Sequence, residues 1–252
     1  MTELSKNKIK FIRSLWQKKF RDELGLFIAE GEKLVEEMLS VFQCKLLVAQ
    51  KDFFETRKHI TAYETLETNK SGMDKITQLK SPPAALAVFV KPDYSKKEPV
   101  FNNKLTLALD DIQDPGNVGA ILRIADWFGI EQALCSEGTA DVFNSKTIQA
   151  SMGSIARVKT YMVNLPELLS TIPKNIPVYG TFLAGEPIYQ AKLKDKGIII
   201  MGNEGSGISN NVAQFVNQKL FIPSFPVNRK TSESLNVAAA TAIICSEFRR
   251  NK

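Results

Sequence analysis

The stretch LTLALDDIQDPGNVGAILRIADWFGI, residues 105–130, decides the fold of this chain. It opens with an apolar run of a strand's length, passes through a loop of Asp, Pro, Gly and Asn, and continues with apolar residues at the i, i+3, i+4, i+7 spacing of a helix. Asp114 and Pro115 are typical of an N-cap and a first helical residue. A strand, a polar loop and a helix in this order predict an open α/β fold, in which sites lie at the carboxyl ends of the strands.

Two polar residues of this stretch are not explained by folding alone. Asn117 falls where the helix begins, and Arg123 falls inside it, roughly 170° around from the centre of the apolar stripe at ~100° per residue. One interpretation is a capping asparagine and a solvated arginine. The other is that both side chains face a ligand or a partner subunit.

The rest of the sequence extends the α/β pattern in both directions. From residue 105 onward, strand-like runs at 105–109, 132–135, 158–163, 178–181, 198–201 and 220–222 alternate with helical stretches. This alternation predicts a mainly parallel sheet with helices on both faces, and the last helix is expected over residues 234–250. The sequence before residue 105 predicts a smaller α/β unit with strands at 26–29, 46–49 and 85–90, a basic helix over residues 1–21, and a break at Ser71 and Gly72.

A polar stretch without periodicity, KPDYSKKEPVFNN, separates the two parts and is typical of a linker. The expected domains are therefore residues 1–91, a linker over 92–104, and residues 105–252.

The composition narrows the class of protein. The chain has 252 residues, of which 44% are hydrophobic and 24% are charged, as in soluble globular proteins. No apolar run has the length of a membrane span, and no signal peptide is visible. Cys44, Cys135 and Cys245 lie far apart, and the only histidine, His59, has no ligand or triad partner nearby in the sequence. We therefore expect a cytoplasmic protein without a metal site.

Positive charge is concentrated at the start of the chain. The formal net charge is +6, and the first 21 residues hold seven Lys or Arg against one acid. A solvated helix face is one interpretation of this pattern. A surface that binds nucleic acid, with Lys18, Lys19 and Arg21 on RNA phosphates, is the other.

A second polar loop, GNEGSGIS at residues 202–209, follows the strand predicted at 198–201. Its three glycines leave the backbone bare around Glu204, so that a ligand could approach closely. The spacing matches neither a P-loop nor the dinucleotide fingerprint. A tight turn capped by Ser209 is the alternative to a ligand loop.

The last predicted loop and helix contribute a third group of polar residues. Ser234 can cap the final helix, and Asn236 near the start of that helix has no evident structural need to be polar. The side chains of this helix are small and apolar on nearly all sides, so the helix is expected to be buried or to lie in an interface.

Three motifs together resemble a known family. NVGAILRIADWFG, IIIMGNEGSGIS and IPS…ESLNVAAATAI are similar to the three motifs of the SpoU/TrmH-type RNA 2′-O-ribose methyltransferases of the SPOUT superfamily, and ASMGSIARV at 150–158 also resembles that family. The likeness covers residues 105–250 in the expected order. KFIRSLWQKKFRDELGLFIAEGEKLVEEML resembles the family's substrate-binding domain, a ribosomal-protein-like α/β fold that binds RNA.

This resemblance implies S-adenosylmethionine as methyl donor, ribosomal or transfer RNA as substrate, a deep C-terminal trefoil knot and a homodimer. Carried over by position, backbone groups of Gly202, Ile222 and Leu235 line the donor pocket. The catalytic set implied in the same way is Asn117, Arg123, Glu204, Ser234 and Asn236. The loop at 224–233 is longer than usual in the family.

The role of Arg123 stays open between two chemistries. The family suggests that it helps to deprotonate the ribose hydroxyl, but a guanidinium is effectively always protonated. The alternative is a bidentate donor that holds the RNA phosphate next to the target ribose. As alternatives to the enzyme as a whole, we weigh a non-catalytic RNA-binding or ribosome-assembly factor of the same fold, and an oxidoreductase, which the missing GxGxxG disfavours.

Overall fold

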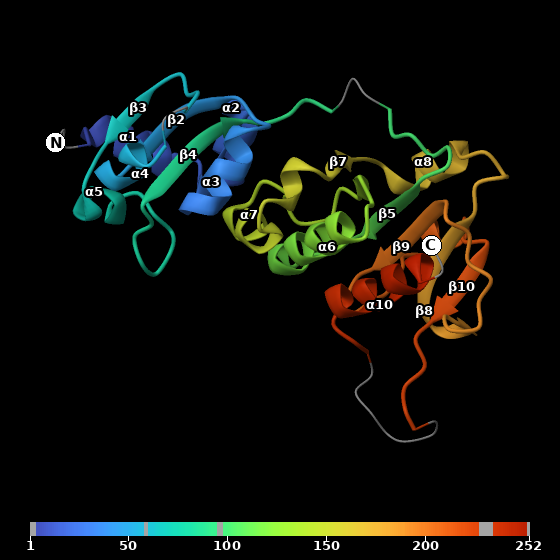
Figure 1. The fold of residues 1–252 in the computed structure, drawn as a ribbon. Coiled ribbons are helices and arrows are strands. Elements are labelled where there is room, and N and C mark those ends of the chain that lie inside the picture. The colour runs from blue at the N-terminus through green and yellow to red at the C-terminus, as the bar shows by residue number, and fades with distance from the viewer. Residues whose placement is uncertain (1–3, 58–59, 95–97, 227–233, 251–252) are drawn as a thin grey trace. The chain divides into compact units, whose positions relative to one another are not determined.

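The computed structural model describes residues 4–57, 60–94, 98–226 and 234–250 (Figure 1). His59, part of the predicted linker and most of the loop at 224–233 lie outside the described residues. The described chain forms two compact units. The first consists of the residues up to Asp93 together with Asp141–Ala156, and the second consists of Tyr94–Ala140 and the residues from Arg157 onward.

The first unit is built on a four-stranded sheet with the order β1-β4-β2-β3. Strands β1 and β2 are antiparallel to β4, whereas β2 and β3 are parallel. The strands are β1 Leu26–Glu30, β2 Cys44–Ala49, β3 Thr65–Glu67 and β4 Ala85–Val90, which confirms the three predicted strands and adds β3. The helices are α1 Lys6–Ser14, α2 Lys18–Leu24, α3 Glu32–Leu39, α4 Lys51–Glu55 and α5 Lys70–Asp74.

Side-chain alternation along these strands fills two cores. On one face, Ile28 and Val88 pack with Ile12 of α1 and with Met73 of α5. The neighbouring positions Phe27 and Phe89 point to the other face and meet Phe42 and Phe143 in an aromatic cluster. Phe143 comes from the distant segment Asp141–Ala156, which contains α7 Ser145–Ser151 and a 3₁₀ turn at Ser154–Ala156.

Two expectations for this unit are wrong. The basic stretch at the start of the chain is two helices, because the chain turns between Ser14 and Lys18. The break expected at Ser71 and Gly72 falls inside α5 instead. Asn69 caps that helix by accepting a hydrogen bond from Gly72 N at 2.9 Å, which lets the helix continue through the glycine.

The second unit has a six-stranded, entirely parallel sheet with the order β10-β8-β9-β5-β6-β7. Helices α8 and α9 pack with Ala108, Ile198 and Ile200 on one face, while α6 and α10 pack against each other and contact β6 and β9. This confirms the predicted parallel sheet. The strands are β5 Leu105–Asp110, β6 Gln132–Cys135, β7 Lys159–Met162, β8 Val178–Pro187, β9 Gly197–Gly202 and β10 Gln218–Phe221. The helices are α6 Pro115–Trp127, α8 Leu165–Thr171, α9 Asn210–Ala213 and α10 Val237–Arg249.

The topology brings two of the predicted loops side by side. Strands β5 and β9 are neighbours with Asp110 opposite Gly202, so the loop that starts α6 and the glycine loop leave adjacent strand ends. In the packing, residues 141–156 belong to the first unit, whereas the predicted boundary places them in the second domain. Among the described helices, none has the length and apolarity that a membrane crossing requires.

Candidate active site

The start of α6 is built as the sequence predicts. Asp114 is the N-cap, its carboxylate accepts a hydrogen bond from Asn117 N at 2.9 Å, and Pro115 follows in the first turn. This cap leaves the side chain of Asn117 free to point away from its own helix. Asn117 therefore enters the site from a rigid helix terminus.

Asn117 joins two residues that are distant in the sequence. Its amide Nδ2 donates to Glu204 Oε1 at 2.7 Å, and its Oδ1 accepts from Asn236 Nδ2 at 3.0 Å. The two partners require opposite ends of the amide, which fixes its orientation. The structure thus brings three of the five predicted catalytic residues into one hydrogen-bonded chain, Asn236–Asn117–Glu204.

Asn236 has a structural role that the sequence analysis did not find. It is the N-cap of α10, and its Oδ1 accepts from Ala238 N at 3.0 Å and from Ala239 N at 3.3 Å. The expectations that Ser234 caps this helix and that Asn236 has no structural need to be polar are both wrong. Because the cap uses the amide oxygen, the nitrogen of Asn236 is directed to Asn117.

The glycine loop is closed by a residue that the sequence analysis missed. Asn203 Nδ2 donates to Asp111 O at 2.7 Å, and Asn203 Oδ1 accepts from Gly205 N at 2.9 Å and Ser206 N at 3.0 Å. The signal was an asparagine followed by Glu, Gly and Ser directly after a strand, which is typical of a side chain that closes a turn. Asn203 thereby ties the loop to the strand end of β5.

Gly202 is required by the loop itself. A Cβ atom on Gly202 would overlap with the backbone of Gly207 and Ile208, whereas a Cβ on Gly205 would meet only Asn203 Oδ1 at 3.6 Å. Ser209 occupies the N-cap position of α9 without a side-chain cap bond, and its N–H donates to Asp110 Oδ2 at 2.8 Å. The bare backbone at Gly202 is therefore needed for the turn even before a ligand is considered.

Arg123 and Ser234 are not joined to the amide chain. Arg123 is exposed on α6, and six residues of helix place it roughly 120° around the axis from Asn117. Ser234 is exposed just before α10. Neither side chain forms a hydrogen bond or ion pair with another described residue. Their catalytic roles stay predictions.

The three residues expected to hold the methyl donor have a suitable chemistry. Gly202 and Ile222 are half-buried at the ends of β9 and beyond β10, and Leu235 is 50% exposed just before α10. The backbone groups of Ile222 and Leu235 form no hydrogen bond with another described residue. Backbone groups without a partner among the described residues, and the exposed side chain of Leu235, have the polar and apolar character that an adenosyl group requires.

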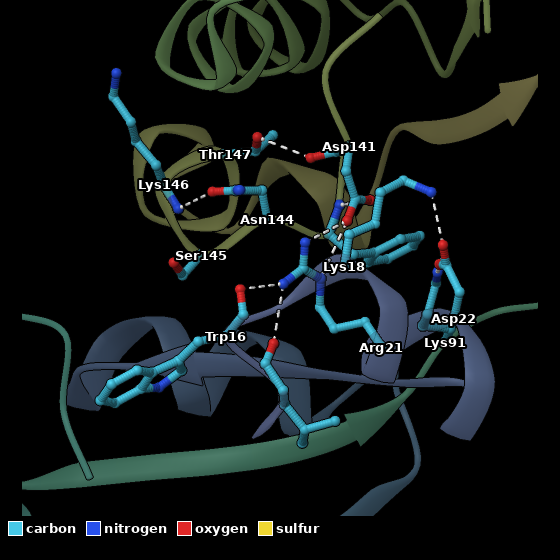
Figure 2. Close-up of polar contacts among 12 residues, drawn as sticks. Trp16, Lys18, Arg21, Asp22, Lys91, Asp141, Asn144, Ser145, Lys146 and Thr147 are labelled. Atoms are coloured by element: carbon cyan, nitrogen blue, oxygen red, sulfur yellow. Dashed lines mark hydrogen bonds and ion pairs between the residues drawn. The ribbon is translucent and has the colours of Figure 1, made fainter. Parts of the chain in front are cut away.

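Of the predicted RNA contacts, Arg21 differs from the expectation. Its side chain is 3% exposed and is held by Asp141, as Figure 2 shows. The side chain of Lys18 is 64% exposed and pairs with Asp22 at 2.6 Å, and Lys19 is also exposed. Because a buried and paired guanidinium is not available to a phosphate, the surface of α2 offers Lys18 and Lys19 alone from the predicted set.

Comparisons with known proteins agree with this architecture. The model of the SpoU rRNA Methylase family matches residues 104–246, and the MRM3-like substrate binding domain matches residues 6–87. The 23S rRNA (guanosine(2553)-2′-O)-methyltransferase RlmP of Bacillus subtilis is 31% identical, and the alignment covers 98% of each chain. A solved structure of a TrmH-family protein from Porphyromonas gingivalis is 43% identical with a TM-score of 0.90 over the whole of both chains. An AdoMet-bound rRNA methyltransferase from Sinorhizobium meliloti is 30% identical with a TM-score of 0.84, covering 100% of this chain and 97% of that one.

The fold, the amide chain and these similarities define an α/β RNA methyltransferase with a separate substrate-binding region. The chain belongs to the SpoU rRNA Methylase family. The family predicted from the three motifs is thereby confirmed.

Proposed function

We propose that this protein transfers the methyl group of S-adenosylmethionine to a ribose 2′-hydroxyl of ribosomal RNA, and that a guanosine of the large-subunit RNA is its target. The amide chain Asn236–Asn117–Glu204 carries the proposal, because it joins residues of all three family motifs by hydrogen bonds. The names of the Bacillus subtilis and Sinorhizobium meliloti relatives support the rRNA substrate and the methyl donor.

The reaction is an in-line displacement. The ribose oxygen forms a bond to the methyl carbon, the carbon–sulfur bond breaks with its electron pair going to sulfur, and the hydroxyl proton passes to Arg123 if it is the base, or to water if Arg123 is a phosphate anchor. S-adenosylmethionine supplies a methyl group on a positively charged sulfur. The chain supplies position: Asn117 and Asn203 hold the Gly202–Gly207 loop, so that the donor-binding backbone is fixed before substrate arrives.

Arg123 completes the proposed catalytic set from an exposed position. As a phosphate anchor it would act through its planar, bidentate fork, and as a base it would accept the ribose proton. Arg123→Lys keeps the charge and loses the fork. If the Arg123→Lys variant retains activity, Arg123 acts through its charge. Near-complete loss of activity with unchanged donor binding indicates that Arg123 acts through its bidentate geometry or as the base. Methyl transfer at the wild-type rate by Arg123→Ala contradicts the assignment of Arg123 to catalysis.

A homodimer with a shared site is part of the proposal. Trp127 is 85% exposed, four residues after Arg123 on the same side of α6. A tryptophan beside a functional arginine is typical of an interface centre. We expect Trp127→Glu to be monomeric in sedimentation at micromolar concentration and to lose methyl transfer. A monomeric wild-type protein with full activity contradicts the shared site.

Lys18 and Lys19 are the proposed phosphate contacts on α2. Each phosphate contact adds about 0.7–0.9 to the slope of log affinity against log salt concentration. The double variant Lys18→Gln/Lys19→Gln is therefore expected to lower that slope by roughly 1.5 and to raise the KM for RNA. An unchanged slope indicates that this surface is only solvated.

The trefoil knot, the cytoplasmic location and the domain boundaries at 91 and 105 also stay proposals. The strand order supports a knot, since β9 returns between β8 and β5 and α10 then packs against α6 and β9. The knot is tested by limited proteolysis. If cleavage releases the end of the second unit as an intact piece and the remainder stays compact, the result counts against the knot.

The experiment for the function uses purified protein, methyl-labelled S-adenosylmethionine and rRNA from a strain that lacks the gene. The expected product is an alkali-resistant linkage at one nucleotide of the large-subunit RNA. If the linkage next to the labelled nucleotide is cleaved by alkali, the methyl group is on the base and the proposal is contradicted. Donor or RNA binding without transfer supports the alternative of a non-catalytic RNA-binding factor, and transfer to tRNA alone contradicts the proposed substrate.

A further inference from the structure

The segment Asp141–Ala156 lies between β6 and β7 in the sequence but packs in the first unit. The peptide bond between Ala140 and Asp141 therefore carries the chain out of the methyltransferase sheet. Asp141 and Ala140 each form hydrogen bonds within their own unit.

On the first-unit side, Asp141 is fixed by Arg21 (Figure 2). Arg21 Nε and Nη2 both donate to Asp141 Oδ2, at 3.0 and 2.6 Å, and the two side chains are only 3% and 10% exposed. Arg21 Nη1 also donates to Leu15 O at 2.9 Å and Trp16 O at 2.8 Å, the carbonyls at the turn between α1 and α2. Asp141 Oδ1 accepts from Phe143 N at 2.9 Å, so both carboxylate oxygens are engaged.

On the second-unit side, the residues just before Asp141 are fixed to the loop that leads into α6. Ala140 N donates to Ile112 O at 2.9 Å, and Thr139 Oγ1 donates to Leu109 O at 3.0 Å. Asp111, the neighbour of Ile112, is the residue that Asn203 holds at 2.7 Å. The contacts of Asp141 in the first unit and those of Ala140 in the second thus adjoin a single peptide bond.

From these contacts we infer that the Arg21–Asp141 pair is a positioning pair for methyl transfer, through which RNA bound on α2 acts on the loop before Asn117. Arg21 lies one turn from Lys18 on α2, so an RNA that moves or orders this helix acts directly on Asp141. The inference rests on the proposed function, since it takes α2 as an RNA contact.

The chemistry of the Arg21–Asp141 pair suits a positioning role better than a role in holding the segment Asp141–Ala156 in the first unit. Phe143 already fastens the segment by apolar contact with Phe27, with ring centroids 4.9 Å apart. A buried ion pair adds little net stability over apolar side chains of similar size, but it fixes direction. Two N–H bonds from one planar group to a single carboxylate oxygen hold the Asp141 side chain in one orientation on α2.

The test measures coupling between RNA and donor rather than stability alone. Asp141→Asn keeps the shape of the side chain, but its single oxygen serves either Arg21 or Phe143 N. Asp126→Asn is the matched control, since Asp126 also pairs with an arginine, Arg157 at 2.8 Å, at an exposed position. Donor affinity is measured by calorimetry with and without the rRNA transcript, and kcat and KM are measured below the unfolding temperature of each variant.

We expect Asp141→Asn to retain the affinities for donor alone and for RNA alone within about twofold. Its kcat is expected to fall at least tenfold, and the factor by which RNA strengthens donor binding, typically about 5- to 150-fold for coupled sites, is expected to approach one. Asp126→Asn is expected to keep wild-type values. Wild-type coupling and kcat in folded Asp141→Asn overturn the inference.

A second variant separates direction from packing. Arg21→Met/Asp141→Leu replaces the pair by apolar side chains and is expected to restore thermal stability while kcat and coupling stay low. Recovery of both in this double variant overturns the inference, because packing alone would then suffice. Failure of the wild-type protein to methylate the transcript refutes the proposed function instead.

Discussion

Phe143 offers a sharp test of how the chain is divided. It lies 52 residues beyond residue 91, the predicted end of the substrate-binding domain, yet it is 7% exposed and packs on Phe27 of β1. Lys91 Nζ also lies 5.1 Å from the Phe143 ring centroid. If residues 141–156 complete the first unit, then Phe143→Ala must destabilise the substrate-binding sheet.

The expected loss follows from the burial. Truncating a buried phenylalanine to alanine costs about 3–5 kcal/mol, and we take the lower value, about 3 kcal/mol, for Phe143. At a urea dependence of about 1.5 kcal/mol per M for a unit of this size, the midpoint falls by about 2 M. Tyr63→Ala is the control, since Tyr63 is 79% exposed in the same unit and its removal is expected to cost no more than about 0.5 kcal/mol.

The two tryptophans make the assay specific for the first unit. Trp16 packs against the core of that unit, whereas Trp127 belongs to the second unit, so all variants are compared in a Trp127→Phe background. In that background the shift in emission on urea denaturation reports on Trp16. A Trp16 transition in Phe143→Ala that coincides with the wild-type transition refutes the assignment of this segment to the first unit.

Three further predictions concern the site and the sheet. Asn117→Ala breaks the amide chain and is expected to lower methyl transfer at least 100-fold with donor affinity within about threefold, measured by single-turnover transfer and calorimetry; wild-type turnover contradicts the role of the chain. Gly202→Ala is expected to weaken donor binding at least tenfold because the loop must move, while Gly205→Ala stays within about threefold; equal affinities would show that the closure of this turn does not shape the donor site. Burial raises the pKa of the Cys135 thiol to about 12 from an ordinary value near 9, so the thiol loses its proton at lower pH in the unfolded chain than in the folded protein. The free energy of unfolding therefore falls as pH rises above about 9, by up to about 1.4 kcal/mol per pH unit. The free energy of unfolding is measured by urea denaturation at pH 8 and pH 10. Cys135→Ala is expected to show a smaller fall between the two pH values than the wild type, and an equal fall contradicts the argument.

Local sequence determined most of the architecture. Short apolar runs identified β5, β6 and β9 and, in the first unit, β1, β2 and β4, because strands that are buried on both faces consist almost entirely of apolar residues. Asp114 and Pro115 marked the start of α6 correctly, since a cap is satisfied within three residues of itself. The three motifs were sufficient to predict the family.

Tertiary structure decided what the polar residues do. Asn117 meets Glu204 across 87 positions and Asn236 across 119, and Arg21 meets Asp141 across 120. No local period contains such pairings, so Arg21 was expected on the surface, and Asn236 was not recognised as a cap. The sequence specifies which side chains can donate, accept or carry charge, but the order of strands in the sheet and the path of the chain between units decide which of them meet.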